Sequence, residues 1–201
     1  MSRKRRLPNF LRAPERAQLL GAAQAELDKA TSPARRRAAA RDQLLVHVGL
    51  NMGLRVSELC KLEVEHLDFT QRSCLVALGK GAKDRYVPIP EKLAARLQVW
   101  IGDRASGPVF PSAGGRRLAI RTVQLRVKRL AKIAGITRNV KCHTLRHTFA
   151  TRLIETGADI RLVQELMGHS SLNTTEVYLH VDVGRMKGAV DRAAEDGEAA
   201  P

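Results

Sequence analysis

The stretch His143-Thr144-Leu145-Arg146-His147, followed by Gly168-His169-Ser170-Ser171 and then by Tyr178, decides the fold and the chemistry expected of this chain. Arg146 is always cationic, and its guanidinium binds phosphate oxygens in a forked geometry. The imidazoles of His143 and His169 can transfer protons near neutral pH. The Tyr178 phenol has an ordinary pKa of about 10, so it needs a base and cationic neighbours before it attacks. Together these side chains predict attack on a phosphodiester without a metal.

The apolar pattern predicts that three consecutive helices carry these groups. Apolar residues recur at every third or fourth position over residues 145–154 and again over residues 160–167, with Gly157 between the two runs. Asn173 and Glu176 then have the spacing of a capping box. Tyr178 is therefore expected in the second turn of a short helix, where the backbone fixes its position.

Length and charge narrow the class of protein. The chain has 201 residues, of which 44% are hydrophobic, which suffices for one well-buried domain. Its formal net charge of +15 predicts a polyanionic partner, because each phosphate that the protein neutralises releases counterions. A coding bias explains a preference for arginine over lysine, but not the excess of positive over negative charge. No apolar run reaches the length of a membrane span, and the charged N-terminus lacks the apolar segment of a signal peptide, so a cytoplasmic protein is expected.

Neither a metal nor a cofactor is expected. Cys60, Cys74 and Cys142 are odd in number and far apart in sequence, which favours reduced structural thiols over disulfides or a zinc site. His143 and His147 have a spacing that could ligate zinc. However, the chain has no glutamate at position 144 and no obvious third ligand.

Two earlier segments contribute further candidate groups. In Gly53-Leu54-Arg55-Val56-Ser57-Glu58-Leu59, a glycine permits a tight turn and an arginine lies just ahead of a short helix. Taken alone, Arg55 and Glu58 fit a surface salt bridge. Residues 73–90 predict a β-hairpin with its turn at residues 79–84. The glycines of this turn lack the spacing of a phosphate-binding loop, and no apolar helix follows them, so a nucleotide site is not expected.

These motifs resemble the tyrosine recombinases, the family of phage integrases and Xer-type site-specific recombinases. The resemblance rests on the run His143–Thr151, the turn Leu166–His169 and the ending Thr175–Val181. It implies a mostly helical α+β catalytic domain with a small antiparallel hairpin or sheet. The expected division is a basic arm over residues 1–12, the catalytic domain over residues 13–181 and a helical tail over residues 182–201. The helical core-binding domain that precedes the catalytic domain in a usual family member is expected to be absent.

The resemblance also implies roles for individual residues. The family's catalytic positions fall on Arg55, Lys80, His143, Arg146, His169 and the nucleophile Tyr178, and Glu58 falls on the acidic position that orients the first arginine. Lys80 matches the general acid carried by the hairpin turn, with Lys83 as the alternative. Lys83 and Arg85 are otherwise expected to contact phosphates. Residues 119–134 predict a basic amphipathic helix that in this family lies along DNA, so contacts are expected from Arg121, Arg126, Lys128 and Arg129.

The expected partner is double-stranded DNA, cleaved by four protomers that assemble on it, in the nucleoid. The tail after residue 182 fits two arrangements, a helix folded onto its own domain and a helix exchanged with a neighbouring protomer. A type IB topoisomerase would use the same chemistry, and a DNA-binding regulator could retain the site without using it. All six catalytic positions are filled, which argues against the regulator.

Overall fold

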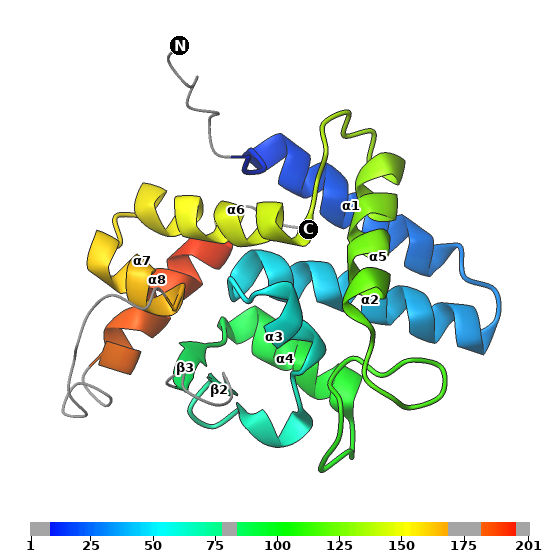
Figure 1. Ribbon diagram of the computed structural model, residues 1–201, viewed down its shortest axis with the longest axis horizontal. Helices are drawn as coiled ribbons and strands as arrows, with labels where there is room; N and C mark the ends of the chain where they lie inside the picture. Colours follow the sequence, from blue (N-terminus) through cyan, green and yellow to red (C-terminus); the bar gives the residue numbers. More distant parts are fainter. Residues whose placement is uncertain (1–8, 78–83, 169–181, 196–201) are drawn as a thin grey trace.

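The computed structural model describes residues 9–77, 84–168 and 182–195 (Figure 1). In chain order, its elements are α1 (Ala13–Asp28), α2 (Pro33–Asn51), α3 (Val56–Cys60), the short 3₁₀ helix η1 (Val64–His66), β1 (Leu67–Asp68), β2 (Ser73–Val76), β3 (Arg85–Pro88), α4 (Glu91–Ile101), α5 (Ile120–Ile133), α6 (Cys142–Glu155), α7 (Ile160–Leu166) and α8 (Asp182–Glu195). The prediction of a mostly helical α+β fold with a small antiparallel sheet is confirmed.

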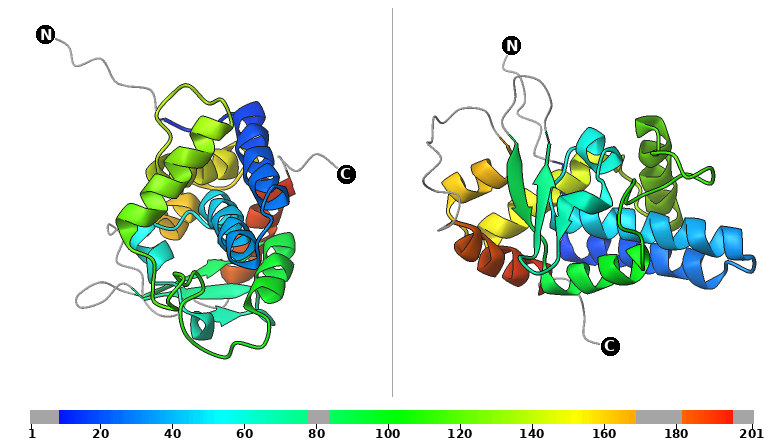
Figure 2. Two further views of the ribbon diagram at one scale, coloured as in Figure 1. Left: turned by 90° about the vertical axis from the view of Figure 1, so that its right-hand side faces the viewer. Right: turned by 90° about the horizontal axis from the view of Figure 1, so that it is seen from below.

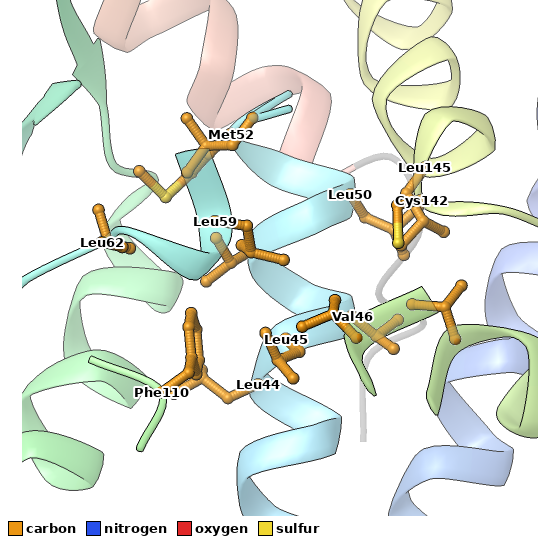
Figure 3. Packing of buried hydrophobic residues seen from close by; sticks show 14 of the residues in the cluster. Leu44, Leu45, Val46, Leu50, Met52, Leu59, Leu62, Phe110, Cys142 and Leu145 are labelled. Atoms are coloured by element: carbon orange, nitrogen blue, oxygen red, sulfur yellow. The ribbon is translucent and has the colours of Figure 1, made fainter. Parts of the chain in front are cut away.

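Helix α2 forms the centre of the fold (Figure 3). Ser32 caps its N-terminus, where the hydroxyl accepts a hydrogen bond from the Arg35 backbone N–H at 3.3 Å, and Pro33 follows in the first turn. Its C-terminal half is buried on nearly every side, from Leu44 to Leu50, as expected for a helix that lies inside a core. Neighbouring helices α1, α4 and α6 pack around it. Helix α2 also contacts α3, which follows Arg55, so it packs against both helices that position the predicted arginines.

Two glycines allow α2 and the following turn to approach α6 closely. A Cβ atom on Gly49 would lie 2.9 Å from the Leu145 side chain. Gly53 has a φ of +61°, and a Cβ atom there would lie 2.3 Å from the Phe149 ring. Only glycine fits such a turn without strain. The turn that leads to Arg55 is therefore held directly against the helix that carries Arg146.

The three strands form one antiparallel sheet in the order β1-β2-β3. Cys74 pairs with Val87, and Val76 pairs with Arg85. The predicted hairpin is thus present, and the short strand β1 extends it by pairing Leu67 with Cys74. Helix α8 lies beside the sheet and contacts β3 (Figure 2).

Helix α8 packs on its own domain. Met186, Ala189, Val190 and Ala193 are buried in a cluster with Phe149 and other residues of α6 and α7. The Asp191 carboxylate accepts hydrogen bonds from Arg72 Nη1 at 3.0 and 3.1 Å, and from the Glu91 backbone N–H at 3.2 Å. Of the two arrangements expected for the tail, this structure shows the helix folded onto its own chain.

Residues 9–12, which the sequence places in the basic arm, pack against the rest of the chain. Leu11 is fully buried, and its backbone N–H donates to Thr148 Oγ1 at 2.8 Å. Asn9 Nδ2 donates to the Asn139 carbonyl at 3.0 Å. The packed domain therefore includes residues 9–12, because an apolar side chain anchors them on α6.

Among the residues that the structure describes, no helix is long and apolar enough to cross a membrane.

Candidate active site

Arg146 lies in the second turn of α6, and its guanidinium is almost completely buried. The helix begins with a cap in which Thr144 Oγ1 accepts a hydrogen bond from the Lys141 backbone N–H at 3.1 Å. Arg146 Nη1 donates to the Gly53 carbonyl at 2.6 Å, and Nη2 donates to the Met167 carbonyl. Burial, with a smaller effect of the Arg55 charge, lowers the pKa of Arg146 to about 10. The group therefore stays cationic at neutral pH, and it joins the turn after α2 to the end of α7.

Arg55 is the more accessible of the two predicted arginines. It precedes α3, and its backbone N–H donates to Glu58 Oε2 at 2.6 Å. Its Nη1 donates to Glu58 Oε1 at 2.9 Å, and its Nη2 donates to the Gly168 carbonyl at 2.9 Å. The side chain is 41% exposed, so it can still reach a ligand from solvent. Arg55 and Arg146 thus bind adjacent carbonyls at the end of α7, at Gly168 and Met167.

Glu58 is the centre of the arginine cluster. Its carboxylate is only 5% exposed and accepts hydrogen bonds from Arg55 and from Arg85, while Arg146 Nη1 lies 3.9 Å from it. Burial raises the pKa of this carboxyl, but the hydrogen bonds from Arg85 and Arg55 outweigh burial and lower it to about 2. One carboxylate is shared among three guanidinium groups. The cluster therefore keeps an excess of positive charge, which suits an anionic ligand.

Sequence reasoning missed the role of Arg85 within this cluster. Its Nη1 and Nη2 donate to the two Glu58 oxygens at 2.9 Å each, and its side chain is 12% exposed. The guanidinium is therefore turned toward Glu58, whereas the sequence predicted a phosphate contact. Strand alternation was the signal that could have found this, because Arg85 and the buried Val87 share one face of β3 and the exposed Tyr86 lies on the other.

His143 and His147 lie together on α6. Their ring centroids are 4.1 Å apart with an interplanar angle of 74°. His143 is exposed, which suits a group that must meet a substrate, whereas His147 is partly buried. Burial lowers the pKa of His147, and the nearby His143 and Arg146 lower it further. His147 is therefore neutral at physiological pH and can accept or donate a hydrogen bond.

Four predicted site residues, Lys80, Lys83, His169 and Tyr178, lie outside the described residues. The described chain does place the ends of the segments that contain them. The hairpin segment is bounded by β2 and by β3, which begins with Arg85. The segment with His169 follows Gly168 directly, and Arg55 binds the Gly168 carbonyl. Both segments therefore leave the described domain at the arginine cluster.

Four of the six residues predicted to contact DNA lie on α5. Arg121, Lys128 and Arg129 are exposed. Arg126 Nη1 lies 3.3 Å from Asp42 Oδ2 on α2, and Arg129 forms an ion pair with Glu26 on α1. These two arginines are thus partly neutralised by carboxylates of the same chain. Contact of α5 with DNA remains a prediction.

The depressed pKa of Glu58 predicts a specific pH dependence of stability. Because the folded-state pKa of about 2 lies below the ordinary value of 4.5, ionised Glu58 stabilises the fold above pH 4.5, by about 3 kcal/mol. This stabilisation is lost as the pH falls from 4.5 toward 2. Urea unfolding at pH 7, 5 and 3 should show a smaller loss for Glu58→Gln than for wild type. Parallel pH curves would contradict this account.

The chain belongs to the phage integrase family, whose sequence pattern matches residues 9–185. A tyrosine recombinase of Pseudothermotoga lettingae is 38% identical over 195 residues, which cover 96% of this chain and 64% of that protein. Tyrosine recombinase XerA of Pyrococcus furiosus is 41% identical over 158 residues, which cover 76% of this chain and 54% of that protein.

Solved structures of recombinases share the fold. A crystal structure of XerA recombinase superposes with a TM-score of 0.69 at 30% identity, covering 92% of this chain and 63% of that one. XerH recombinase, in a pre-cleavage complex with its difH substrate, superposes with a TM-score of 0.68 at 28% identity, covering 90% of this chain and 52% of that one. This chain therefore spans between 52% and 64% of the length of these four proteins.

Proposed function

We propose that this chain is the catalytic part of a tyrosine-type site-specific recombinase, which cleaves and rejoins double-stranded DNA through a 3′-phosphotyrosyl intermediate. One observation carries the proposal. Arg55 and Arg146 bind the carbonyls of Gly168 and Met167, directly before the segment that contains His169 and Tyr178. Two cations are thereby held at the start of the segment that bears the nucleophile, as metal-free phosphoryl transfer requires.

In the proposed reaction, the Tyr178 oxygen attacks a DNA phosphorus atom, and the bond from phosphorus to the 5′-oxygen breaks. His143 takes the phenolic proton, Lys80 gives a proton to the leaving 5′-oxygen, and His169 positions a phosphate oxygen. Arg55 and Arg146 stabilise the charge that builds on the non-bridging oxygens. The phosphotyrosyl bond conserves the energy of the broken bond, so a 5′-hydroxyl from a second duplex can reverse the step without ATP.

Strand exchange between two duplexes needs two cleavages on each, and we propose that four protomers on DNA supply them. XerH, which shares the fold, is described as bound to its difH DNA substrate both before and after cleavage.

Exchange of α8 between protomers would require breaking the ion pair of Asp191 with Arg72 and the packing of the buried face of α8. The protein would act at the nucleoid, where its substrate lies. Membership of the integrase family favours recombination over topoisomerase activity.

Covalent trapping on nicked DNA tests the proposal. A nick close to the cleaved bond lets the short 5′-hydroxyl product diffuse away, so the phosphotyrosyl complex accumulates and migrates slowly in a denaturing gel. Wild type should form this complex equally well with EDTA and with Mg²⁺, whereas Tyr178→Phe should form none. A wild-type protein that binds DNA but never becomes attached to it would be a DNA-binding regulator. Loss of the complex in EDTA, with recovery on adding Mg²⁺ or Zn²⁺, would exclude the mechanism.

A further inference from the structure

The Arg85 guanidinium is bonded entirely to groups of the arginine cluster and of the end of α7. Both terminal nitrogens donate to the Glu58 carboxylate at 2.9 Å, and Nε donates to the Leu166 carbonyl at 3.3 Å. All three kinds of guanidinium nitrogen are therefore engaged inside the protein. The pair is well shielded from solvent, with side-chain exposures of 12% for Arg85 and 5% for Glu58. Arg85 thus binds the same carboxylate that Arg55 binds, which gives it a supporting position in the cluster.

The Arg85 guanidinium also supports the turn that leads to His169. A Cβ atom added to Gly168 would lie 3.0 Å from Arg85 Nη1 and 3.1 Å from Arg85 Cζ, so the Gly168 backbone packs directly on the guanidinium plane. Gly168 has a φ of +61°, which also favours glycine. The carbonyl of this same residue accepts the hydrogen bond from Arg55. Arg85 therefore contacts both partners of Arg55, which are Glu58 and Gly168.

We propose that Arg85 is a positioning residue for DNA cleavage. It fixes Glu58 and the Leu166–Gly168 turn relative to each other, and through them it aims Arg55 and the segment that begins with His169. It is also the first residue of β3, the strand that follows the segment with Lys80 along the chain. This inference rests on the proposed function, since the orientation of Arg55 matters only if Arg55 binds a phosphate that is attacked.

The geometry requires arginine specifically. A lysine at position 85 would keep the positive charge beside Glu58, but one ammonium cannot donate along the two parallel directions that a guanidinium provides and also reach the Leu166 carbonyl. Arg85→Lys therefore separates charge from geometry. It also keeps a cation opposite the buried Glu58 carboxylate at the position of Arg85, which limits the loss of stability.

The decisive experiment measures the single-turnover cleavage of nicked DNA at saturating protein, together with the salt dependence of DNA binding and the melting temperature. Arg85→Lys should slow cleavage by about 10- to 100-fold, the range for a displacement of up to about 1 Å at a reacting group. Its DNA affinity and salt dependence should equal those of wild type. Arg117→Lys is the matched control, because Arg117 pairs with the buried Glu63 away from the cluster, and it should cleave at the wild-type rate.

A double-mutant cycle tests whether Arg85 acts through Glu58. In a Glu58→Gln background, Arg85→Lys should slow cleavage by no more than about twofold further, because the partner through which it acts is already altered. Fully additive losses would overturn the proposal. So would wild-type cleavage by Arg85→Lys, or an Arg85→Ala variant whose salt dependence falls by the amount of one phosphate contact. A rate that merely follows the folded fraction would also overturn it.

The wild-type protein distinguishes the two proposals. If wild type forms no covalent complex, the proposed function itself fails. If wild type forms the complex and Arg85→Lys behaves like wild type, only the Arg85 proposal fails.

Discussion

Arg146→Ala is expected to slow DNA cleavage by about 10²–10³-fold or more, the loss typical of removing one preorganised donor to a developing oxyanion. The structure adds a second expectation. The side chain is 4% exposed and donates to the carbonyls of Gly53 and Met167, so its removal leaves two buried acceptors without this donor. The melting temperature should therefore fall too. The rate must be measured at a temperature at which the variant is fully folded, by single-turnover cleavage at saturating protein.

Arg152 provides the matched control for Arg146. It lies on the same helix, is equally buried, and donates to the Leu50 carbonyl at 3.3 Å and to Asn51 Oδ1 at 3.2 Å, at the end of α2. Arg152→Ala should lower the melting temperature but leave the cleavage rate of the folded protein near that of wild type. If both variants lose activity only in proportion to their stability, Arg146 is a structural residue and the proposed mechanism loses one of its two phosphate-binding cations.

Elements that local patterns determine were predicted well. The apolar pattern over residues 145–154 lies within α6, which runs from Cys142 to Glu155, and the basic helix expected over residues 119–134 runs from Ile120 to Ile133. The 3.6-residue apolar periodicity acts within one segment, so the sequence displays it directly. The hairpin could be predicted for the same reason, from glycine-rich sequence between two runs of strand-type residues.

Features that depend on contacts between distant segments could not be predicted from one sequence. The close approach of Gly53 to Phe149 joins residues nearly a hundred positions apart, and so does the hydrogen bond from Arg146 to the Gly53 carbonyl. The anchoring of Leu11 on Thr148 likewise spans most of the chain. Sequence reasoning could expect Arg55 and Arg146 to bind phosphate. The pair of Arg55 and Glu58 was expected, because the two residues are three positions apart. The sequence could not show that Arg85 binds the same carboxylate, because no local pattern encodes which distant charges meet in the fold.

The final prediction concerns Lys80 and Tyr178, the proposed general acid and nucleophile. A 5′-alkoxide is a poor leaving group, because an alcohol ionises near the pKa of water, about 16, whereas a thiol ionises near 8.5. Protonation of the leaving oxygen by a positioned acid contributes roughly 10²–10⁴-fold to the rate. Lys80→Ala should therefore cleave ordinary DNA slower by about that factor. Replacing the bridging 5′-oxygen with sulfur removes the need for the proton, so Lys80→Ala should cleave the sulfur-substituted DNA nearly as fast as wild type does.

Two further variants make this test specific. Tyr178→Phe should cleave neither substrate, because no nucleophile remains whatever the leaving group. Lys83→Ala should bind DNA somewhat more weakly and show no selective response to sulfur. If sulfur instead rescues Lys83→Ala and leaves Lys80→Ala slow, the acid is Lys83, on the other side of the hairpin turn. If sulfur rescues neither lysine variant, neither lysine protonates the leaving oxygen. The exposed His143 on α6 then becomes the residue to test with the same pair of substrates, since it is the remaining proton donor among the described catalytic positions.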